Sequence, residues 1–429
     1  MSNTSAAVAT DFKVSHMAEN LIGSEIIKLA GEIRELIAQG NKIYNFTIGD
    51  FDPKIFPIPN ELKAEIIRAY NEDETNYPAA DGIADLRNAV SSLIQKWQGL
   101  TYADNEILIA GGARPVIYAI YQAIVDPGDK VLFPVPSWNN NHYTHLSNAT
   151  PVFVETKPEN NFMPDAHELK PYLKDATLLA LCSPLNPTGT VFSKTQLEEI
   201  CDLVIEENNR RSPDQKPLYI MYDQIYWALT YGNNQHFDPV SLRPELRPYT
   251  IYVDGISKSF AATGVRVGWA FGPKKVIDKM KSILGHVGAW SPKAEQVASG
   301  RFLRNNEAVD RYLHSFKNDI EARLNGFYAG IQQLKKDGLP VDAIAPMAAI
   351  YLTVRFDLTG LTEPNGNKIE TAEQATSYLL REAKLAVVPF SAFGASKSSP
   401  WYRLSVGTAS IQDVDNAVHS LKSALSRLS

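Results

Sequence analysis

The sequence predicts an α/β fold, in which a mainly parallel sheet carries helices on both faces and a smaller α+β region follows. Three observations lead to this fold class. Between about residues 60 and 325, short apolar runs rich in β-branched and aromatic residues recur along the chain. Amphipathic segments of helical length separate these runs, and polar or glycine-containing turns end them. Strands that alternate with helices in this way are typical of a parallel sheet covered on both faces.

The alternation changes near residue 325, beyond which strands and helices follow in a less regular order. We therefore predict an N-terminal arm with part of a small domain (residues 1–60), a large domain (61–325) and the rest of the small domain (326–429). A chain of 429 residues is long enough for two or three domains, at roughly 150 residues each.

In the first part of the chain, apolar spacing and turn residues define each element. Apolar residues at helical spacing behind Ser24 predict the first helix, and Gly40 ends it. A later strand ends at Gly111-Gly112, and Pro115 favours the start of the next helix. The expected elements are helix 24–38, strand 43–48, helix 59–70, strand 107–110, helix 116–124 and strand 131–135.

In the rest of the chain, strands are indicated by runs such as residues 249–253, which the turn signal Asp254-Gly255 ends. The segment Asn186-Pro-Thr-Gly189 is a turn by its chemistry alone. The expected elements are strand 177–182, helix 193–207, strand 218–222, strand 249–253, a strand after residue 266, strands near 341–346 and 350–356, helix 371–383, strand 385–389 and strand 401–406.

The stretch after strand 249–253 carries the first functional hypothesis. Lys258 follows a core strand, and Arg266 stands beside another apolar run. Open α/β sheets bind ligands at the carboxyl ends of their strands. A desolvated lysine can form a Schiff base with a carbonyl group, and an arginine offers a rigid fork to phosphate oxygens. The pair suits a carbonyl cofactor that carries a phosphate, and the alternative is a solvated loop with surface charges.

Ser257-Lys258 with Gly264, Arg266 and Gly268 resembles the attachment site of the class I/II aminotransferases. These are fold type I enzymes that depend on pyridoxal 5′-phosphate (PLP), typified by aspartate aminotransferase. The glycine-rich turn, Asn-Pro-Thr-Gly and Asp-x-x-Tyr appear in the family's order, so the similarity covers nearly the whole chain. The resemblance implies a sheet of the seven-stranded type. It also implies transfer of an amino group between an α-amino acid and a 2-oxo acid in two half-reactions.

The resemblance further implies roles for individual residues. Lys258 would hold PLP and act as the base that moves the α-proton, while Asp223 would keep the ring nitrogen protonated and Tyr226 would hydrogen-bond the 3′-oxygen. These three are the expected catalytic residues. Backbone N–H groups before a helix would take the phosphate, and a tryptophan would stack on the ring. The residues expected around the cofactor are Tyr77, Gly112, Ala113, Arg114, Trp138, Asn186, Asp223, Tyr226, Ser257, Lys258 and Arg266.

Four residues are expected at the substrate. By resemblance, Gly49 and Asn186 touch the substrate carboxylate, and Arg403 forks the α-carboxylate. A turn glycine and a solvated edge arginine are the plainer interpretations of two of them. Arg114 is the candidate for a second carboxylate, which would make the substrate aspartate or glutamate. The alternative is that Arg114 gives only its backbone N–H to the phosphate.

Tyr77 implies a homodimer with shared active sites, because the family uses this tyrosine at the PLP phosphate of the neighbouring subunit; packing against Pro78 is the alternative. Two positions depart from the family pattern. Gly255 stands where the family often has a serine that binds phosphate, so Ser257 or a backbone N–H would have to serve. Phe390 replaces a glycine in the Pro-Gly-x-x-Phe-Gly loop, which puts the loop shape in doubt and would narrow the substrate entrance.

Composition narrows the compartment and the partners. The net charge of −6 gives no reason to expect nucleic acid or an anionic membrane. No apolar run approaches the ~20 residues that span a bilayer, and the N-terminus lacks the pattern of a secretory signal. Two cysteines, Cys182 and Cys201, cannot build a disulfide framework, so we expect buried thiols in the cytoplasm. No metal site is expected, and His142 and His145 are interpreted as structural or surface residues.

Two alternative functions stay open at this point. The nearer one is another PLP chemistry on the same fold, such as that of a β-lyase, a decarboxylase or a synthase. The more distant one is a PLP-binding protein without catalysis. The sequence does not identify the amino acid or the oxo acid.

Overall fold

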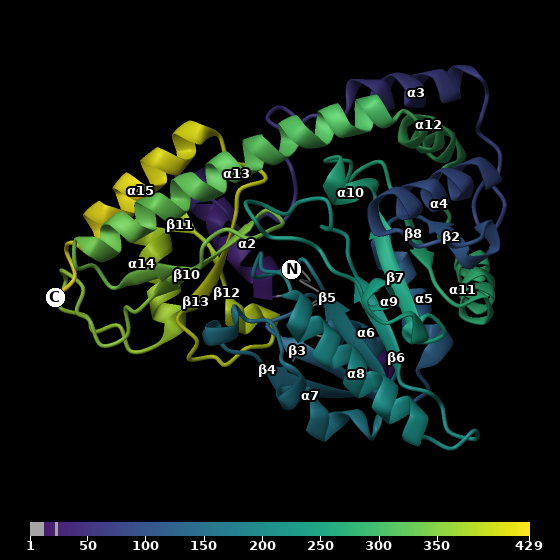
Figure 1. Ribbon diagram of the computed structural model, residues 1–429. Coiled ribbons are helices and arrows are strands. Elements are labelled where there is room, and N and C mark those ends of the chain that lie inside the picture. Colours follow the sequence, from purple (N-terminus) through teal and green to yellow (C-terminus); the bar gives the residue numbers. More distant parts are fainter. Residues whose placement is uncertain (1–12, 22–24) are drawn as a thin grey trace, which may run out of the picture.

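The structure, a computed structural model, describes residues 13–21 and 25–429. A large sheet and a small sheet stand side by side, and the long helix α13 (Asn306–Lys336) runs across both (Figure 1). The expectations for the first residues of the chain and for Ser24 as the start of a helix lie outside the described residues.

The large sheet has seven strands in the order β2-β8-β7-β6-β5-β3-β4. β8 runs antiparallel to β2 and β7, and the other pairs are parallel. The strands are β2 (Ile107–Ala110), β3 (Lys130–Val135), β4 (Thr150–Glu155), β5 (Ala176–Cys182), β6 (Tyr219–Asp223), β7 (Thr250–Gly255) and β8 (Gly268–Phe271). The prediction of a mainly parallel sheet is confirmed. Because the parallel strands end at one edge, the turns after β5, β6 and β7 meet there.

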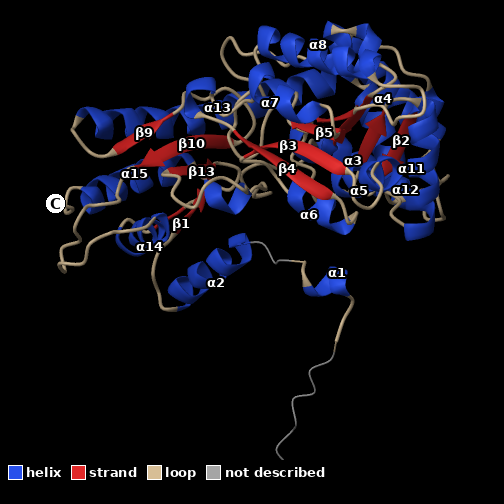
Figure 2. Ribbon diagram, turned by 90° about the horizontal axis from the view of Figure 1, so that it is seen from below, coloured by secondary structure: helices blue, strands red, loops and turns tan. Residues whose placement is uncertain are grey.

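Helices bury both faces of this sheet, as Figure 2 shows for α7 and α8 on one side of β3–β5 and α6 on the other. Apolar residues of these helices join those of the strands in two separate cores. One face carries α5 (Ala113–Ile124), α6 (Asn140–Leu146) and α11 (Lys274–Val287). The other carries α4 (Ala84–Gln98), α7 (Ala166–Leu173), α8 (Lys194–Arg210), α9 (Pro239–Leu242) and α12 (Lys293–Arg304), with α3 (Asn60–Asn71) against α12.

The small sheet is antiparallel, in the order β12-β13-β10-β9. A separate pair of short strands, β1 and β11, is parallel. The strands are β1 (Tyr44–Asn45), β9 (Val341–Ala343), β10 (Tyr351–Phe356), β11 (Leu385–Ala386), β12 (Val388–Pro389) and β13 (Trp401–Ser405). The remaining helices are α1 (His16–Glu19), α2 (Glu25–Ala38), α10 (Ile256–Ser259), α14 (Ala372–Glu382) and α15 (Ile411–Leu425). Apolar residues of α13, α14 and α15 form the core beside the small sheet.

Helix α13 links the two cores. Near its start, Ala308, Val309 and Leu313 are buried in the core of the large sheet. Further on, Phe316 and Ile320 are buried in the core of the small sheet. Residue 325 therefore lies inside a continuous helix and not in a linker. The expected domain boundaries at residues 60 and 325 stay a prediction.

Several predicted elements differ in extent from those observed. The expected strand 43–48 forms a ladder only at Tyr44–Asn45, because Phe46 already hydrogen-bonds to two separate sheets, through Ala386 and Ser405. The expected strand 385–389 is divided between β11 and β12, which pair with β1 and β13. In both cases the pairing of β1 with β11 joins segments that are distant in the sequence.

The described residues bear on two further expectations. Among them, no helix is both long enough and apolar enough to cross a membrane. Cys182 and Cys201 are free thiols, as expected. Burial raises the pKa of Cys201 to about 12 and that of Cys182 well above its usual value.

Candidate active site

Lys258 lies in the short helix α10, which directly follows β7, and not in an irregular loop. Its Nζ donates a hydrogen bond to the carbonyl oxygen of Gly49 at 2.6 Å. Burial lowers the pKa of Lys258 to about 8, and the positive charges of Arg403, Arg114 and Arg266 add to this effect, while Asp50 opposes it. A substantial fraction of the amine is therefore neutral near physiological pH, as a nucleophile or a base requires.

The turn between β2 and α5 forms a cradle for an anion. Gly112 precedes the helix with φ of +100°, and a Cβ at this position would lie 2.1 Å from Nη2 of Arg266. Arg266 donates to the carbonyl oxygens of Gly111 and Thr263, both at 2.7 Å. Ala113 is the first residue of α5, so its backbone N–H has no partner within the helix. Helix N–H groups and an arginine fork together suit a phosphate. The helix begins at Ala113, three residues earlier than expected, and Gly112 before it has a backbone conformation that favours glycine.

The packing around Gly255 explains why this position has no serine, in contrast to the family pattern. It pairs with Gly268 where β7 and β8 run side by side. A Cβ at Gly255 would lie 2.8 Å from Cα of Gly268 and 2.8 Å from the carbonyl oxygen of Val267. A serine would force the strands apart, so no side chain at position 255 is available to bind phosphate. Ser257 is buried in the helix that carries Lys258.

Asp223 is the last residue of β6. The backbone N–H of Ile225 donates to its Oδ1 at 3.1 Å. Burial raises the pKa of Asp223 to about 6. No ion pair to Asp223 is present within the described part of the chain, so a cation placed against it would gain a strong partner and lower this pKa. A protonated ring nitrogen is such a cation.

Arg403 lies in β13 and is only 2% exposed. Its Nη1 donates to Oδ1 of Asn186 at 3.0 Å, and its Nη2 donates to the carbonyl oxygen of Thr47 at 2.6 Å. The carbon of the guanidinium lies 4.8 Å from the ring centre of Tyr351 and 4.9 Å from that of Phe393. Its Nε is buried without a partner, and no described carboxylate pairs with the group. A buried cation without a counter-ion is poised to bind an anion.

Tyr226 meets a residue that sequence reasoning missed. Its hydroxyl lies 2.6 Å from the hydroxyl of Tyr351, and both side chains are buried. Asp50 was also missed, although it directly follows Gly49; it accepts a hydrogen bond from Thr263 at 2.7 Å. The position of Asp50 at a strand end is visible in the sequence. Tyr351 lies inside an apolar run, where nothing distinguishes it from a core tyrosine.

Trp138 and Arg114 lie together at another side of the site. The carbon of the Arg114 guanidinium lies 5.5 Å from the centre of the Trp138 ring. Trp138 is half-buried and its ring centre is 6.2 Å from that of Phe393. The Arg114 side chain is exposed, so its guanidinium is accessible to a ligand.

Phe390 does not line an opening. Its side chain is fully buried, and its ring packs edge-on against Phe162 with ring centres 5.1 Å apart. The expectation that it narrows the entrance is therefore wrong. It is the first residue of the 3-10 turn Phe390–Phe393 and packs in a buried cluster with Val388 and Phe393. Phe393, not Phe390, faces Arg403.

Tyr77 lies apart from the hydrogen-bonded centre. Its side chain is 82% exposed, and its ring packs edge-on against Trp290, with ring centres 5.2 Å apart. The backbone next to Trp290 borders the phosphate cradle, since Gly111 donates to the carbonyl oxygen of Ala289 at 2.9 Å. Contact with Trp290, and not with Pro78 alone, holds this tyrosine at the surface.

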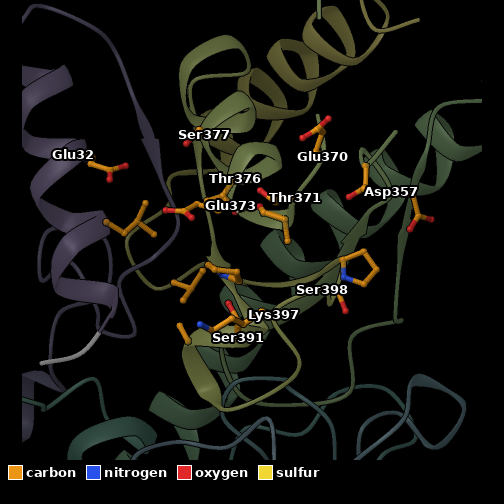
Figure 3. Close-up of a pocket in the computed structure, with 17 residues that line it drawn as sticks. Glu32, Asp357, Glu370, Thr371, Glu373, Thr376, Ser377, Ser391, Lys397 and Ser398 are labelled. Atoms are coloured by element: carbon orange, nitrogen blue, oxygen red, sulfur yellow. Dashed lines mark hydrogen bonds between the residues drawn. The ribbon is translucent and has the colours of Figure 1, made fainter. Parts of the chain in front are cut away.

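An open cavity of about 730 Å³ lies outside this site (Figure 3). Carboxylates and hydroxyls from the start of α14 line it, together with Glu32 of α2 and Lys397. None of the expected site residues belongs to its lining. The described residues also include no group of histidine, cysteine, aspartate and glutamate side chains that could hold a metal ion. His145 hydrogen-bonds the carbonyl oxygen of Met17 at 2.8 Å, which fits a structural role.

Comparisons with known proteins agree with this arrangement. Residues 41–421 match the family described as aminotransferase class I and II. An aspartate aminotransferase of Rhizobium meliloti is 29% identical over 410 residues, which cover 95% of this chain and 94% of the relative. A crystal structure of the aspartate aminotransferase from Rhizobium meliloti superposes with a TM-score of 0.88 at 26% identity, covering 97% of this chain and all of that one. An aromatic aminotransferase from Pyrococcus horikoshii gives a TM-score of 0.80 at 26% identity, over 92% of this chain and 98% of its own.

Proposed function

Because the chain belongs to the class I and II aminotransferases, we propose that it binds PLP at Lys258 and acts as a homodimer on an acidic amino acid. The protein is a transaminase, which moves an amino group between an α-amino acid and a 2-oxo acid. The relatives do not favour a β-lyase, a decarboxylase, a synthase or a non-catalytic binding protein.

The residues present fit this cofactor. The cradle at Gly112, where a Cβ would meet the Arg266 guanidinium, would hold the phosphate. Asp223, partly buried and without a cation partner among the described residues, would hold the protonated ring nitrogen. Tyr226 and Asn186 would hold the 3′-oxygen, and Trp138 would stack on the ring. PLP, when bound, supplies a ring that withdraws electrons from the α-carbon of the substrate.

The side chains of this chain then perform the proton transfers and the orientation. Nζ of Lys258 would accept the proton from the α-carbon and deliver it to the C4′ carbon of the cofactor, a role suited to its pKa of about 8. The carboxylate of Asp223 keeps a proton on the ring nitrogen. Arg403 binds the α-carboxylate and so fixes the direction of the C–H bond relative to Lys258.

The observation that carries this proposal is the position of the partly buried Lys258 amine, hydrogen-bonded to Gly49, where burial and then the charges of three arginines lower its pKa. The test is a single half-reaction. Protein loaded with PLP receives an amino acid without any oxo acid. We expect one equivalent of oxo acid per site and an amino group retained on the protein. Repeated release of ammonia or carbon dioxide would contradict transamination and favour a lyase or a decarboxylase.

The proposed homodimer rests on Tyr77. An 82%-exposed tyrosine held beside the phosphate cradle suits a surface that a second subunit covers. We mix an inactive Lys258→Ala chain with a Tyr77→Phe chain, once the Tyr77 change has been found to lower activity. If the sites are shared, hybrid dimers contain one intact site and regain activity that neither parent dimer has. Verified hybrids without recovery would contradict shared sites.

The proposed substrate, aspartate or glutamate, rests on Arg114. Arg403 accounts for one carboxylate, and Arg114 presents an accessible guanidinium on Trp138. If it reads the second carboxylate, Arg114→Ala lowers kcat/KM for aspartate or glutamate by about 10–100-fold, while alanine and an aromatic amino acid are little affected. An equal loss for all substrates would assign Arg114 to the cofactor phosphate, and no loss would contradict the acidic substrate.

We also propose a cytoplasmic location, which two free thiols, the buried Cys201 and the partly buried Cys182, support. Imaging or fractionation of the tagged full-length protein tests this, and recovery in an oxidising compartment would contradict it.

Site residues of both sheets take part in the proposed mechanism, so the large and small domains would share one active site.

A further inference from the structure

Tyr351 is the first residue of β10, and it is 1% exposed. Its hydroxyl lies 2.6 Å from that of Tyr226, and the two rings meet edge-on with centres 5.6 Å apart. The guanidinium of Arg403 also lies against the Tyr351 ring, with its carbon 4.8 Å from the ring centre. Tyr351 therefore connects a proposed cofactor ligand to a proposed substrate ligand.

The backbone around Tyr351 fixes where this hydroxyl lies. A Cβ at Gly189 would come within 2.2 Å of the carbonyl oxygen of Tyr351, so the strand rests directly on the turn after β5. Ala348 donates to the carbonyl oxygen of Gly189 at 2.8 Å and strengthens this contact. At the other end, a Cβ at Gly49 would lie 2.8 Å from the hydroxyl oxygen of Tyr351. Backbone on both sides thus limits the ring to a narrow space.

One hydrogen bond joins two hydroxyl groups, so one tyrosine must donate and the other accept. If Tyr226 donated to Tyr351, its proton would point away from a cofactor oxygen. If Tyr351 donates, its buried proton is satisfied and the proton of Tyr226 stays free for the cofactor. A hydroxyl that accepts a hydrogen bond also becomes a stronger donor, because the two bonds polarise each other.

We propose that Tyr351 is a positioning residue that donates its hydroxyl proton to Tyr226 and so directs the Tyr226 proton to the 3′-oxygen of PLP. The inference rests on the proposed function, in which PLP occupies the site. Tyr351 acts through Tyr226 and not on the reacting atoms themselves.

This arrangement has a spectroscopic consequence. A hydrogen bond from Tyr226 stabilises negative charge on the 3′-oxygen, so it lowers the pH at which the absorbance of the bound cofactor changes. Without Tyr351, Tyr226 is a weaker donor and that midpoint rises. We expect Tyr351→Phe to raise this midpoint by about 0.4–1 pH unit, which corresponds to the free energy of one hydrogen bond. Tyr226→Phe raises it further.

The test compares absorbance–pH titrations of the wild-type holoenzyme, Tyr351→Phe, Tyr226→Phe and the double variant. If Tyr351 acts through Tyr226, the double variant has the midpoint of Tyr226→Phe alone. Tyr378→Phe is the matched control, because its buried hydroxyl donates to the carbonyl oxygen of Ala424 in α15, at 2.8 Å, and not to Tyr226 or Tyr351. That variant should leave the midpoint unchanged.

A second variant keeps the shape of the side chain. The side chain of 3,5-difluorotyrosine is a stronger acid and a stronger hydrogen-bond donor than that of tyrosine. With difluorotyrosine at position 351, the midpoint of the absorbance–pH titration should therefore fall below that of the wild type. This result is expected even if Tyr351→Phe folds poorly. An unchanged or raised midpoint with difluorotyrosine, or additive shifts in the double variant, would overturn the inference.

Borohydride reduction separates this inference from the proposed function. If the wild type carries no label on Lys258, the cofactor assignment fails and the inference fails with it. If Lys258 is labelled in both the wild type and Tyr351→Phe but their midpoints agree, only the role of Tyr351 is overturned.

Discussion

The carboxyl edge of the large sheet and the interior of the small sheet contribute different kinds of groups to one site. Lys258 and Asp223 stand at the ends of β7 and β6, where turns release the chain from the sheet. Arg403 and Tyr351 lie within strands of the small sheet, and their side chains reach the site only because that sheet rests on the turn after β5.

The electrostatics of the two regions differ in the same way. Burial brings the pKa of Lys258 down to about 8 and that of Asp223 up to about 6, so both groups can change protonation near neutral pH. Burial also lowers the pKa of Arg403, but a guanidinium stays charged in proteins. The large sheet thus supplies groups that handle protons, and the small sheet supplies a fixed charge that recognises a carboxylate.

The largest expected effect concerns the proton-handling side. Asp223→Ala removes the counter-ion of the ring nitrogen, so the ring withdraws electrons poorly. We expect kcat to fall by roughly 10²–10³-fold, the scale of losing one preorganised electrostatic partner. Single-turnover kinetics with an α-deuterated amino acid should show that proton removal has become slower. Near-normal turnover would assign this role to another residue and would contradict the statement that the large sheet supplies the groups that handle protons.

A smaller effect is expected on the recognition side. Arg403→Lys keeps the charge but loses the two-pronged contact, so KM should rise by roughly 10–100-fold while the cofactor spectrum stays unchanged. Arg355→Lys is the matched control, because Arg355 lies in β10 but is paired with Asp357 at the surface. A change in the cofactor spectrum of Arg403→Lys would contradict the assignment of Arg403 to carboxylate recognition alone.

The smallest effect concerns stability. Asp254 is buried at the end of β7, where it accepts hydrogen bonds from the backbone of Gly255 at 2.7 Å and from Gln224 at 3.4 Å. Burial raises its pKa well above the usual value, and nearby Asp223 adds to this. Below the unfolded pKa both states are protonated, and as pH rises the unfolded state alone gains a charge, so stability is lost.

We therefore expect Asp254→Asn, which cannot ionise, to be more stable than the wild type at pH 8 and to lose most of this advantage at pH 4. Thermal melts across this pH range measure the difference. The amide of Gln224 can turn to offer its oxygen to the new side chain. A variant that is less stable at every pH would contradict a neutral, protonated Asp254.

The same contrast explains what could be predicted from the sequence. Strand, turn and helix follow one another locally in the large sheet, so the positions of Asp223 and Lys258 at strand ends could be read from apolar runs and turn residues. The pairing of Leu385–Ala386 with Tyr44–Asn45, and the meeting of Tyr351 with Tyr226, depend on segments more than 100 residues apart. Phe390 was misjudged because its neighbour Phe162 is also distant in the sequence.

The central claim is that Lys258 is the residue that holds the cofactor, and borohydride trapping tests it most directly. Protein mixed with a limiting amount of PLP is reduced, digested and mapped by mass spectrometry. With its pKa lowered to about 8, Lys258 has a far larger neutral fraction at pH 7 than an ordinary lysine, so it should take the label selectively. The account predicts a reduced cofactor on Lys258 and none in the Lys258→Ala protein. A stoichiometric label on any other lysine would contradict it.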